Sequence, residues 1–135
     1  VEEDKKVTIS AGDFGGPSAG LMFALEIYDR LVPEDITKGY TIAGTGTISP
    51  AGEVGVIGGV EHKVVAADRA GADIFFVPED LYPDAHESFA PVLNASDAKR
   101  RAEEIGTAMK VVPVGTLDEA LDYLESLPPK KETGA

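Results

Sequence analysis

The 135-residue sequence contains no cysteine, and it has only 12 basic side chains against 24 acidic ones. The absence of cysteine excludes disulfides, thiolate catalysis and cysteine-based metal sites. The formal net charge of −12 argues against nucleic-acid binding and against docking on anionic lipid, because both contacts require a basic surface. We therefore expect no nucleic-acid partner and no direct membrane contact by this domain.

Apolar runs long enough to cross a bilayer are also missing, and the chain opens on charged residues without a starting methionine. We expect the sequence to be part of a longer protein. Its hydrophobic fraction of 43% and charged fraction of 27% suit a folded globular protein, and its length suits one domain. We predict a domain over residues 1–127 and a disordered tail over residues 128–135.

Residue patterns predict a mixture of strands and helices. The predicted strands are residues 7–10, 40–48, 53–57, 74–77 and 109–114. The predicted helices are residues 17–32, 60–70, 96–105 and a last one from residue 117. A turn at residues 49–52 makes residues 40–57 a hairpin, and Thr116 to Glu119 has the spacing of a capping box. Apolar residues surround most of the first helix, so we expect it to be largely buried in a two-layer α+β domain.

The most informative stretch is Gly15-Gly16-Pro17-Ser18-Ala19-Gly20, in which a serine lies in the first turn of a predicted helix. Backbone N–H groups at a helix N-terminus lack partners within the helix and carry partial positive charge. These groups can stabilise an oxyanion that forms beside Ser18. Glycines allow a substrate backbone to come close. The loop can therefore supply a nucleophile and an oxyanion hole together.

Three other interpretations of this loop are open. Serine commonly caps helices and Gly-Pro often precedes them, so the stretch can be purely structural. The residues also fit the Gly-x-Ser-x-Gly nucleophile elbow, but that site needs a histidine, and only His62 and His86 exist. A phosphate-binding loop is disfavoured because its Gly-Lys-Ser/Thr ending is absent.

A serine hydroxyl needs a base to act as a nucleophile at neutral pH, and Lys63 is the best candidate. Helical spacing places Lys63 on an apolar face, where it is the only polar side chain among Val60, Val64 and Ala67. Such a lysine either snorkels, with its ammonium in water, or is buried, where desolvation favours the neutral amine. A buried, neutral Lys63 can accept the proton of the serine.

The run Gly44-Thr45-Gly46-Thr47 places hydroxyl groups between glycines on a predicted strand. One of these hydroxyls can hold a neutral lysine amine by a hydrogen bond. The alternative is that these are ordinary strand threonines, which β-branching favours.

Together these pieces resemble the proteolytic domain of the Lon protease family. Order and spacing agree over nearly the whole chain, in residues 16–21, 45–48, 52–63, 70–78, 112–114 and 117–124. The resemblance implies that Ser18 is the nucleophile, that Lys63 is the base and that Thr45 supports the lysine. Gly15, Gly16 and Pro17 would belong to the oxyanion or substrate loop. The implied fold is the family's two-layer α+β sandwich without its N-terminal strands.

The implied activity is that of a serine endopeptidase, which cleaves proteins or peptides through an acyl-enzyme and needs neither a cofactor nor a metal. The family often assembles as a hexameric ring, so a homo-hexamer is expected. An alternative is a catalytically silent binding or assembly module with the same fold.

ATP-dependent members usually carry an acidic residue where this chain has Gly15. In this respect the chain is more similar to the branch that lacks the ATPase and carries a PDZ module. That branch is typically held on the outer face of a bacterial membrane. We therefore expect an extracytoplasmic, membrane-tethered location, with a cytoplasmic one as the alternative.

Overall fold

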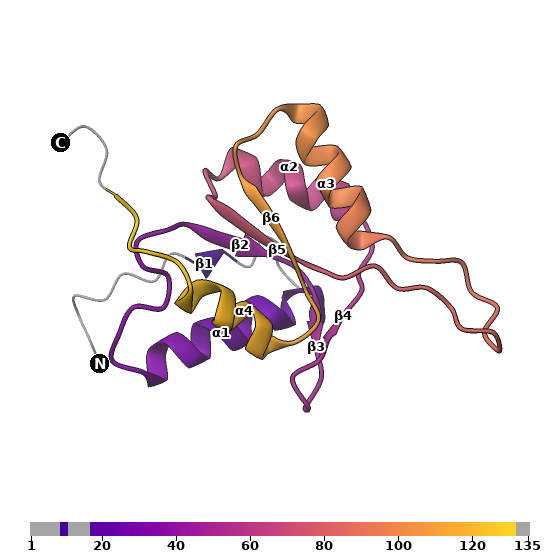
Figure 1. Ribbon diagram of the computed structural model, residues 1–135, viewed down its shortest axis with the longest axis horizontal. Helices are drawn as coiled ribbons and strands as arrows, with labels where there is room; N and C mark the ends of the chain where they lie inside the picture. The colour runs from indigo at the N-terminus through magenta and orange to yellow at the C-terminus, as the bar shows by residue number, and fades with distance from the viewer. Residues whose placement is uncertain (1–8, 11–16, 132–135) are drawn as a thin grey trace.

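The computed structural model describes residues 9–10 and 17–131 (Figure 1). The elements, in chain order, are β1 (Ile9–Ser10), a 3₁₀ turn η1 (Pro17–Ala19), α1 (Gly20–Leu31), β2 (Ile42–Gly44), β3 (Thr47–Ile48), β4 (Val54–Gly55), α2 (Val60–Arg69), β5 (Ile74–Pro78), α3 (Asn94–Ile105), β6 (Lys110–Val114) and α4 (Leu117–Glu125). The predicted mixed α+β class is confirmed. Residues 7 and 8 of the first predicted strand lie outside the described residues.

Four strands form one parallel sheet in the order β1-β2-β5-β6. Strand β5 lies inside the sheet, and all five of its residues are buried. Its near-continuous apolar sequence is typical of a parallel strand that is covered on both faces. Because parallel strands need long crossovers, helices connect them and pack on the sheet.

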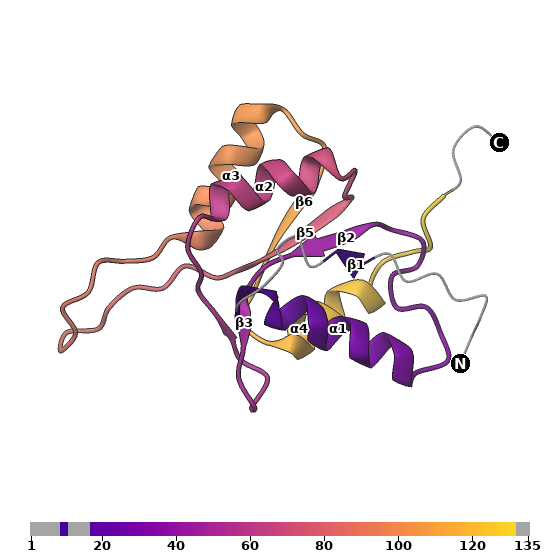
Figure 2. The same cartoon turned by 180° about the vertical axis from the view of Figure 1, so that it is seen from behind.

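Helices cover both faces of this sheet (Figure 2). One face packs against α1 and α4, through a cluster that includes Leu21, Leu25, Ile42, Phe76 and Leu124. The other face packs against α2 and α3, through a cluster that includes Ala43, Val60, Val64, Phe75 and Ala98. Neighbouring residues of β2 and β5 therefore enter opposite clusters, as the alternation of side chains along a strand requires. The structure therefore has three layers, helix–sheet–helix, rather than the predicted two, because the local sequence pattern of a helix does not tell which face of the sheet it covers.

Helix α1 is not largely buried, contrary to the expectation from its apolar sequence. Leu21, Met22 and Leu25 face the sheet and are fully buried. Phe23 and Leu31, however, expose 52% and 78% of their surface. The helix lies on the outside of the domain, so the sheet and α4 bury only one side of it. The remaining apolar side chains form a stripe that faces outward.

The predicted hairpin is confirmed for β3 and β4, which pair antiparallel around the turn at residues 49–52. Its predicted first strand, residues 40–48, is in fact two strands. Residues 42–44 join the parallel sheet as β2, and residues 47–48 form β3. The chain changes direction between them at Gly46, whose φ of +143° is rarely adopted by residues with a side chain.

The remaining predicted elements are present within one or two residues of their expected ends. The predicted N-cap is confirmed, because Thr116 Oγ1 accepts from Glu119 N at 3.1 Å; the return bond of the box is shifted by one residue, since Glu119 Oε1 accepts at 2.6 Å from the N–H of Gly115. Residues 79–93 form an irregular arm that projects from the domain (Figure 1). Asp80 fixes its base by accepting from Ser96 N in the first turn of α3.

The segment after α4 contacts the domain in the described part, which ends at residue 131. Tyr40 donates its hydroxyl proton to Pro128 O at 3.0 Å, and Lys130 Nζ lies 2.9 Å from Asp73 Oδ2. The predicted domain boundary at residue 127 stays a prediction. Within the described ranges, no helix combines the length and apolar character needed to span a membrane.

Replacing Gly44 by alanine tests how closely α1 packs on the sheet. An added Cβ would lie 2.9 Å from Met22 Sδ and 3.0 Å from Phe76 O. We expect Gly44→Ala to lower the free energy of unfolding by about 1–3 kcal/mol in urea denaturation, as overpacking does. Gly58→Ala is the control, because its Cβ would meet no atom within 4 Å. Equal effects of the two substitutions would contradict the close packing.

Asp73 generates a prediction about acid stability. Burial acts to raise the pKa of Asp73, but hydrogen bonds from Lys130 and Thr41 N and the charge of Lys130 outweigh it and lower the pKa. A lowered pKa stabilises the fold above the unfolded value of about 3.9 and loses that contribution as the pH falls. We expect Asp73→Asn to cost of order 1 kcal/mol at neutral pH.

The difference between the wild type and Asp73→Asn should shrink below a pH of about 4, as measured by urea denaturation. Glu103→Gln, at an exposed position of α3, serves as the control for removal of one surface charge. A difference that stays constant between neutral and acidic pH would show that ionisation of Asp73 does not stabilise the fold.

Candidate active site

Ser18 lies in η1, directly before α1, and is half-buried. Its backbone carbonyl accepts hydrogen bonds from Gly46 N at 2.9 Å and from Thr45 Oγ1 at 3.3 Å. One turn further, Leu21 N donates to Gly46 O at 3.0 Å. These bonds fix the residue that was predicted as the nucleophile against the link between β2 and β3.

Glycines allow this close approach. At Gly20, a Cβ would lie 2.9 Å from Ile48 N, so any larger residue would push β3 away from the start of α1. At Gly46, a Cβ would lie 2.8 Å from Val54 Cγ1. Gly20 belongs to the glycine-containing stretch at residues 15–20, and Gly46 to the run at residues 44–47. Their role in the structure is to bring backbone segments together around Ser18.

Thr45 is 1% exposed, and its backbone N donates to Phe76 O at 3.0 Å. It therefore lies at the carboxyl end of β2, next to the end of β5. Ala43 belongs to the core cluster under α2, whereas a Cβ on Gly44 would meet Met22 of α1. By alternation along the strand, residue 45 falls on the side of Ala43. Its hydroxyl donates to the Ser18 carbonyl, at the start of α1.

Lys63 lies in the first turn of α2 and is half-buried. Val60, Val64 and Ala67 of the same helix are buried against the sheet, as the predicted apolar face requires. Gly59 precedes the helix with a φ of +69°, and its carbonyl accepts from His62 N and Lys63 N. The left-handed glycine thus starts α2 one turn before Lys63.

Asn94 is a residue that sequence reasoning missed. It is 3% exposed, and its amide group pairs with the backbone of Ile57, donating to Ile57 O at 3.0 Å and accepting from Ile57 N at 2.9 Å. This pair ties the segment before α2 to the first residue of α3. A polar residue two positions before the predicted helix at residues 96–105 was the available signal, but its partner lies 37 positions away.

The starts of α1, α2 and α3 therefore lie near one another at one edge of the sheet. Ser18 at the start of α1 bonds to the end of β2, and Asn94 at the start of α3 bonds to the segment that begins α2. This is the edge where the parallel strands end, the usual place for sites on such sheets. Thr45 lies at this edge, between Ser18 and the face covered by α2. The predicted loop residues Gly15 and Gly16 lie outside the described residues, and Pro17 is exposed.

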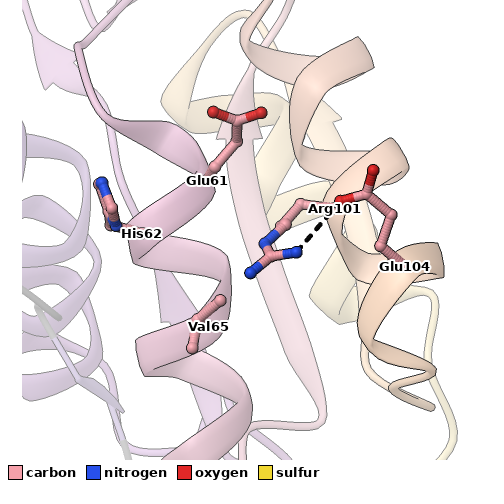
Figure 3. Close-up of a pocket in the computed structure, with 5 residues that line it drawn as sticks. All are labelled: Glu61, His62, Val65, Arg101 and Glu104. Carbon is pink, nitrogen blue, oxygen red and sulfur yellow. Dashed lines mark hydrogen bonds and ion pairs between the residues drawn. The ribbon is translucent and has the colours of Figure 1, made fainter.

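A shallow hollow of about 240 Å³ lies between α2 and α3 (Figure 3). Glu61, His62 and Val65 of α2 line it together with Arg101 and Glu104 of α3, which form an ion pair at 3.1 Å that Figure 3 marks. His62 and His86 are both exposed, and His86 belongs to the projecting arm. Within the residues described, no cluster of three or more histidine, aspartate or glutamate side chains is placed to hold a metal ion.

Comparison with known proteins finds one family over most of the chain. Residues 7–125 match the family model of the Lon protease (S16) C-terminal proteolytic domain. The chain is 34% identical over 118 residues to a Lon protease of Roseiflexus castenholzii, covering 87% of this chain and 13% of that protein. It is 33% identical over 114 residues to a Lon protease of Trichlorobacter lovleyi, covering 84% of this chain and 12% of that protein.

A Lon protease of the Aster yellows witches'-broom phytoplasma is 29% identical over 109 residues, or 81% of this chain and 12% of that protein. The chain thus spans only 12–13% of the length of these curated relatives. The similarity concerns the proteolytic portion of larger proteins.

Thr45→Val tests the bond that joins the two candidate segments. Valine keeps the β-branched shape but cannot donate to the Ser18 carbonyl. We expect faster hydrogen exchange of the Gly46 amide, which donates to the same carbonyl, and a loss of about 1 kcal/mol in unfolding free energy. Thr45→Ser retains the hydroxyl and should keep the protection. If the valine variant exchanges as slowly as the serine variant, the hydroxyl does not support this junction.

Proposed function

Because the chain belongs to the family of Lon protease (S16) C-terminal proteolytic domains, we propose that it is a serine endopeptidase with Ser18 as nucleophile and Lys63 as base. The observation that carries this proposal is the junction of Thr45 and Gly46 with Ser18 at the carboxyl edge of the sheet. Lys63 is half-buried in the first turn of α2, between Val60 and Val64, which pack on the same sheet. A nucleophile and a base within reach of each other are what serine chemistry requires.

In the proposed reaction, the neutral amine of Lys63 removes the proton of the Ser18 hydroxyl as Oγ attacks the substrate carbonyl carbon. The backbone N–H groups of Gly16 and Ser18 stabilise the oxyanion, since Pro17 has no N–H to donate. The Lys63 ammonium then gives its proton to the leaving amine, and an acyl-enzyme remains. The same amine takes a proton from water, which attacks the ester, releases the acid and restores Ser18.

Thr45 is a positioning residue in this proposal. Its hydroxyl donates to the Ser18 carbonyl, which leaves the lone pairs of Oγ1 able to accept a hydrogen bond from the Lys63 amine. One buried hydroxyl would then orient both partners. Because Thr45 is 1% exposed, water competes little for these bonds.

Three further parts of the proposal rest on the sequence. Gly15 stands where ATP-dependent relatives usually have an acid, which supports the PDZ-associated branch and with it an extracytoplasmic location. The proposed substrates are proteins or peptides, and the reaction requires no cofactor. A ring of six copies is proposed for the assembly.

Replacement of the two proposed catalytic residues tests the mechanism. We expect Ser18→Ala and Lys63→Ala each to lower kcat/KM for casein cleavage by the whole protein by roughly 10³-fold or more. The two residues act as a unit, so the loss of either one removes most of the rate enhancement that the pair provides. The double variant should be no worse than either single one. His62→Ala and His86→Ala should retain activity, since a nucleophile-elbow esterase alone would need one of them.

A fluorophosphonate probe separates a protease from a silent module of the same fold. We expect the probe to label the wild type at Ser18 and to label Ser18→Ala and Lys63→Ala much more weakly, with unchanged circular dichroism. An unlabelled wild-type protein would favour the binding module. Loss of labelling in His62→Ala or His86→Ala, with retention in Lys63→Ala, would instead identify histidine as the base.

A further inference from the structure

A second concave surface lies at the far end of α1 from Ser18. It is a groove of about 330 Å³ between the end of α1, the turn that follows it, and α4. Its apolar lining consists of Tyr28, Ile36, Leu121 and Leu124. Ile36 and Leu124 are buried members of the core, and Tyr28 is 40% exposed. The groove therefore has a firm apolar floor that reaches the surface.

The outward stripe of α1 extends this floor. Ile27 and Leu31, at 59% and 78% exposure, precede and follow Tyr28 on the helix, and Phe23 lies one turn before Ile27. Residues four apart are neighbours on a helix surface, so Phe23, Ile27 and Leu31 form a continuous row. A contiguous exposed apolar surface of this kind is uncommon on a protein without a partner.

The rim of the groove is acidic. Glu34, Asp35 and Glu125 line it, together with one cation, Lys38. Lys38 Nζ donates to Glu125 O and Leu127 O, both at 2.7 Å, so its charge is directed at the carbonyl groups that end α4. Asp35 Oδ1 accepts from Thr37 N at 3.0 Å and from Thr37 Oγ1 at 2.7 Å. The rim thus presents negative charge around an apolar floor.

We propose that this groove, extended by the row on α1, is a docking site for a protein segment that carries bulky apolar side chains flanked by lysine or arginine. The apolar side chains fill the floor, and the basic ones meet the acidic rim. A two-fold contact between two copies fits less well, because it would place the same acidic rim against itself in a protein of net charge −12.

The docking site is separate from the proposed active site. Helix α1 has 12 residues, so its two ends lie about 18 Å apart. A segment bound in the groove leaves the edge with Ser18 and Thr45 open. Binding at the groove can therefore be measured in Ser18→Ala, and its outcome does not depend on peptide-bond hydrolysis.

The test uses three fluorescein-labelled 14-residue peptides and the whole protein carrying Ser18→Ala. The first peptide is an amphipathic helix of leucine and lysine, the second replaces lysine by glutamate, and the third replaces leucine by serine. We expect fluorescence anisotropy to show that the leucine–lysine peptide binds at least about tenfold more tightly than either of the others. If the serine–lysine peptide binds as tightly as the leucine–lysine peptide, the binding is due to charge attraction alone and the proposal is overturned.

Matched variants locate the binding surface. The double variant Glu34→Lys/Glu125→Lys should weaken binding of the leucine–lysine peptide about tenfold, and Tyr28→Ser about fivefold. Glu103→Lys on α3 and Tyr82→Ser on the arm are the controls, since both positions are exposed on other surfaces. Equal weakening by the controls would overturn the assignment. Sedimentation that shows a dimer dissolved by Tyr28→Ser would assign the groove to a second copy and overturn it also.

Discussion

Two peptide groups of the link between β2 and β3 hold the start of α1, and the candidate site depends on this contact. Gly46 donates its N–H to Ser18 and accepts at its carbonyl from Leu21, while the Thr45 hydroxyl adds a third bond. The first N–H groups of a helix have no partner within the helix, so an outside carbonyl is needed to satisfy Leu21. The link satisfies it and at the same time sets the direction in which the helix leaves the sheet.

Small residues at three positions make this contact possible. Without side chains at Gly20, Gly44 and Gly46, backbone segments approach to distances that a Cβ would prevent. Glycine costs conformational entropy in a folded chain, so three of them at one junction are expected only where close approach is required. The glycines of this junction therefore allow the backbone segments to come close, and the large apolar residues of β5 and α1 stabilise the fold around them.

The helices, the strands of the parallel sheet and the N-cap of α4 could be predicted from local patterns, because apolar spacing, proline and glycine are local signals. Two errors have physical causes. The sequence of α1 is apolar on nearly every side, and burial depends on what packs there, which no local pattern contains. Residues 40–48 read as one strand, since the change of direction at Gly46 depends on its contact with α1 rather than on its neighbours in sequence.

The residues of the candidate site also fall into those that a local pattern identifies and those that it does not. Ser18, Thr45 and Lys63 could be selected because each carries chemistry in a recognisable setting. Asn94 could not, because its role comes from a partner 37 positions away in the chain. Long-range contacts of this kind bring motifs that are far apart in the sequence to the same edge of the sheet.

Helix α1 has apolar residues on the side that packs on the sheet and also on the side that faces outward. A helix that packs on a sheet needs apolar residues on one side only, yet Phe23, Ile27 and Leu31 continue them around the other. These residues add nothing to the contact with the sheet, and exposed apolar surface is unfavourable in water. Their presence is explained if the outer side of the helix is covered in the working protein. In the proposed function the end of α1 that holds Ser18 receives the substrate, and a partner seated in the acidic groove at the other end leaves Ser18 accessible.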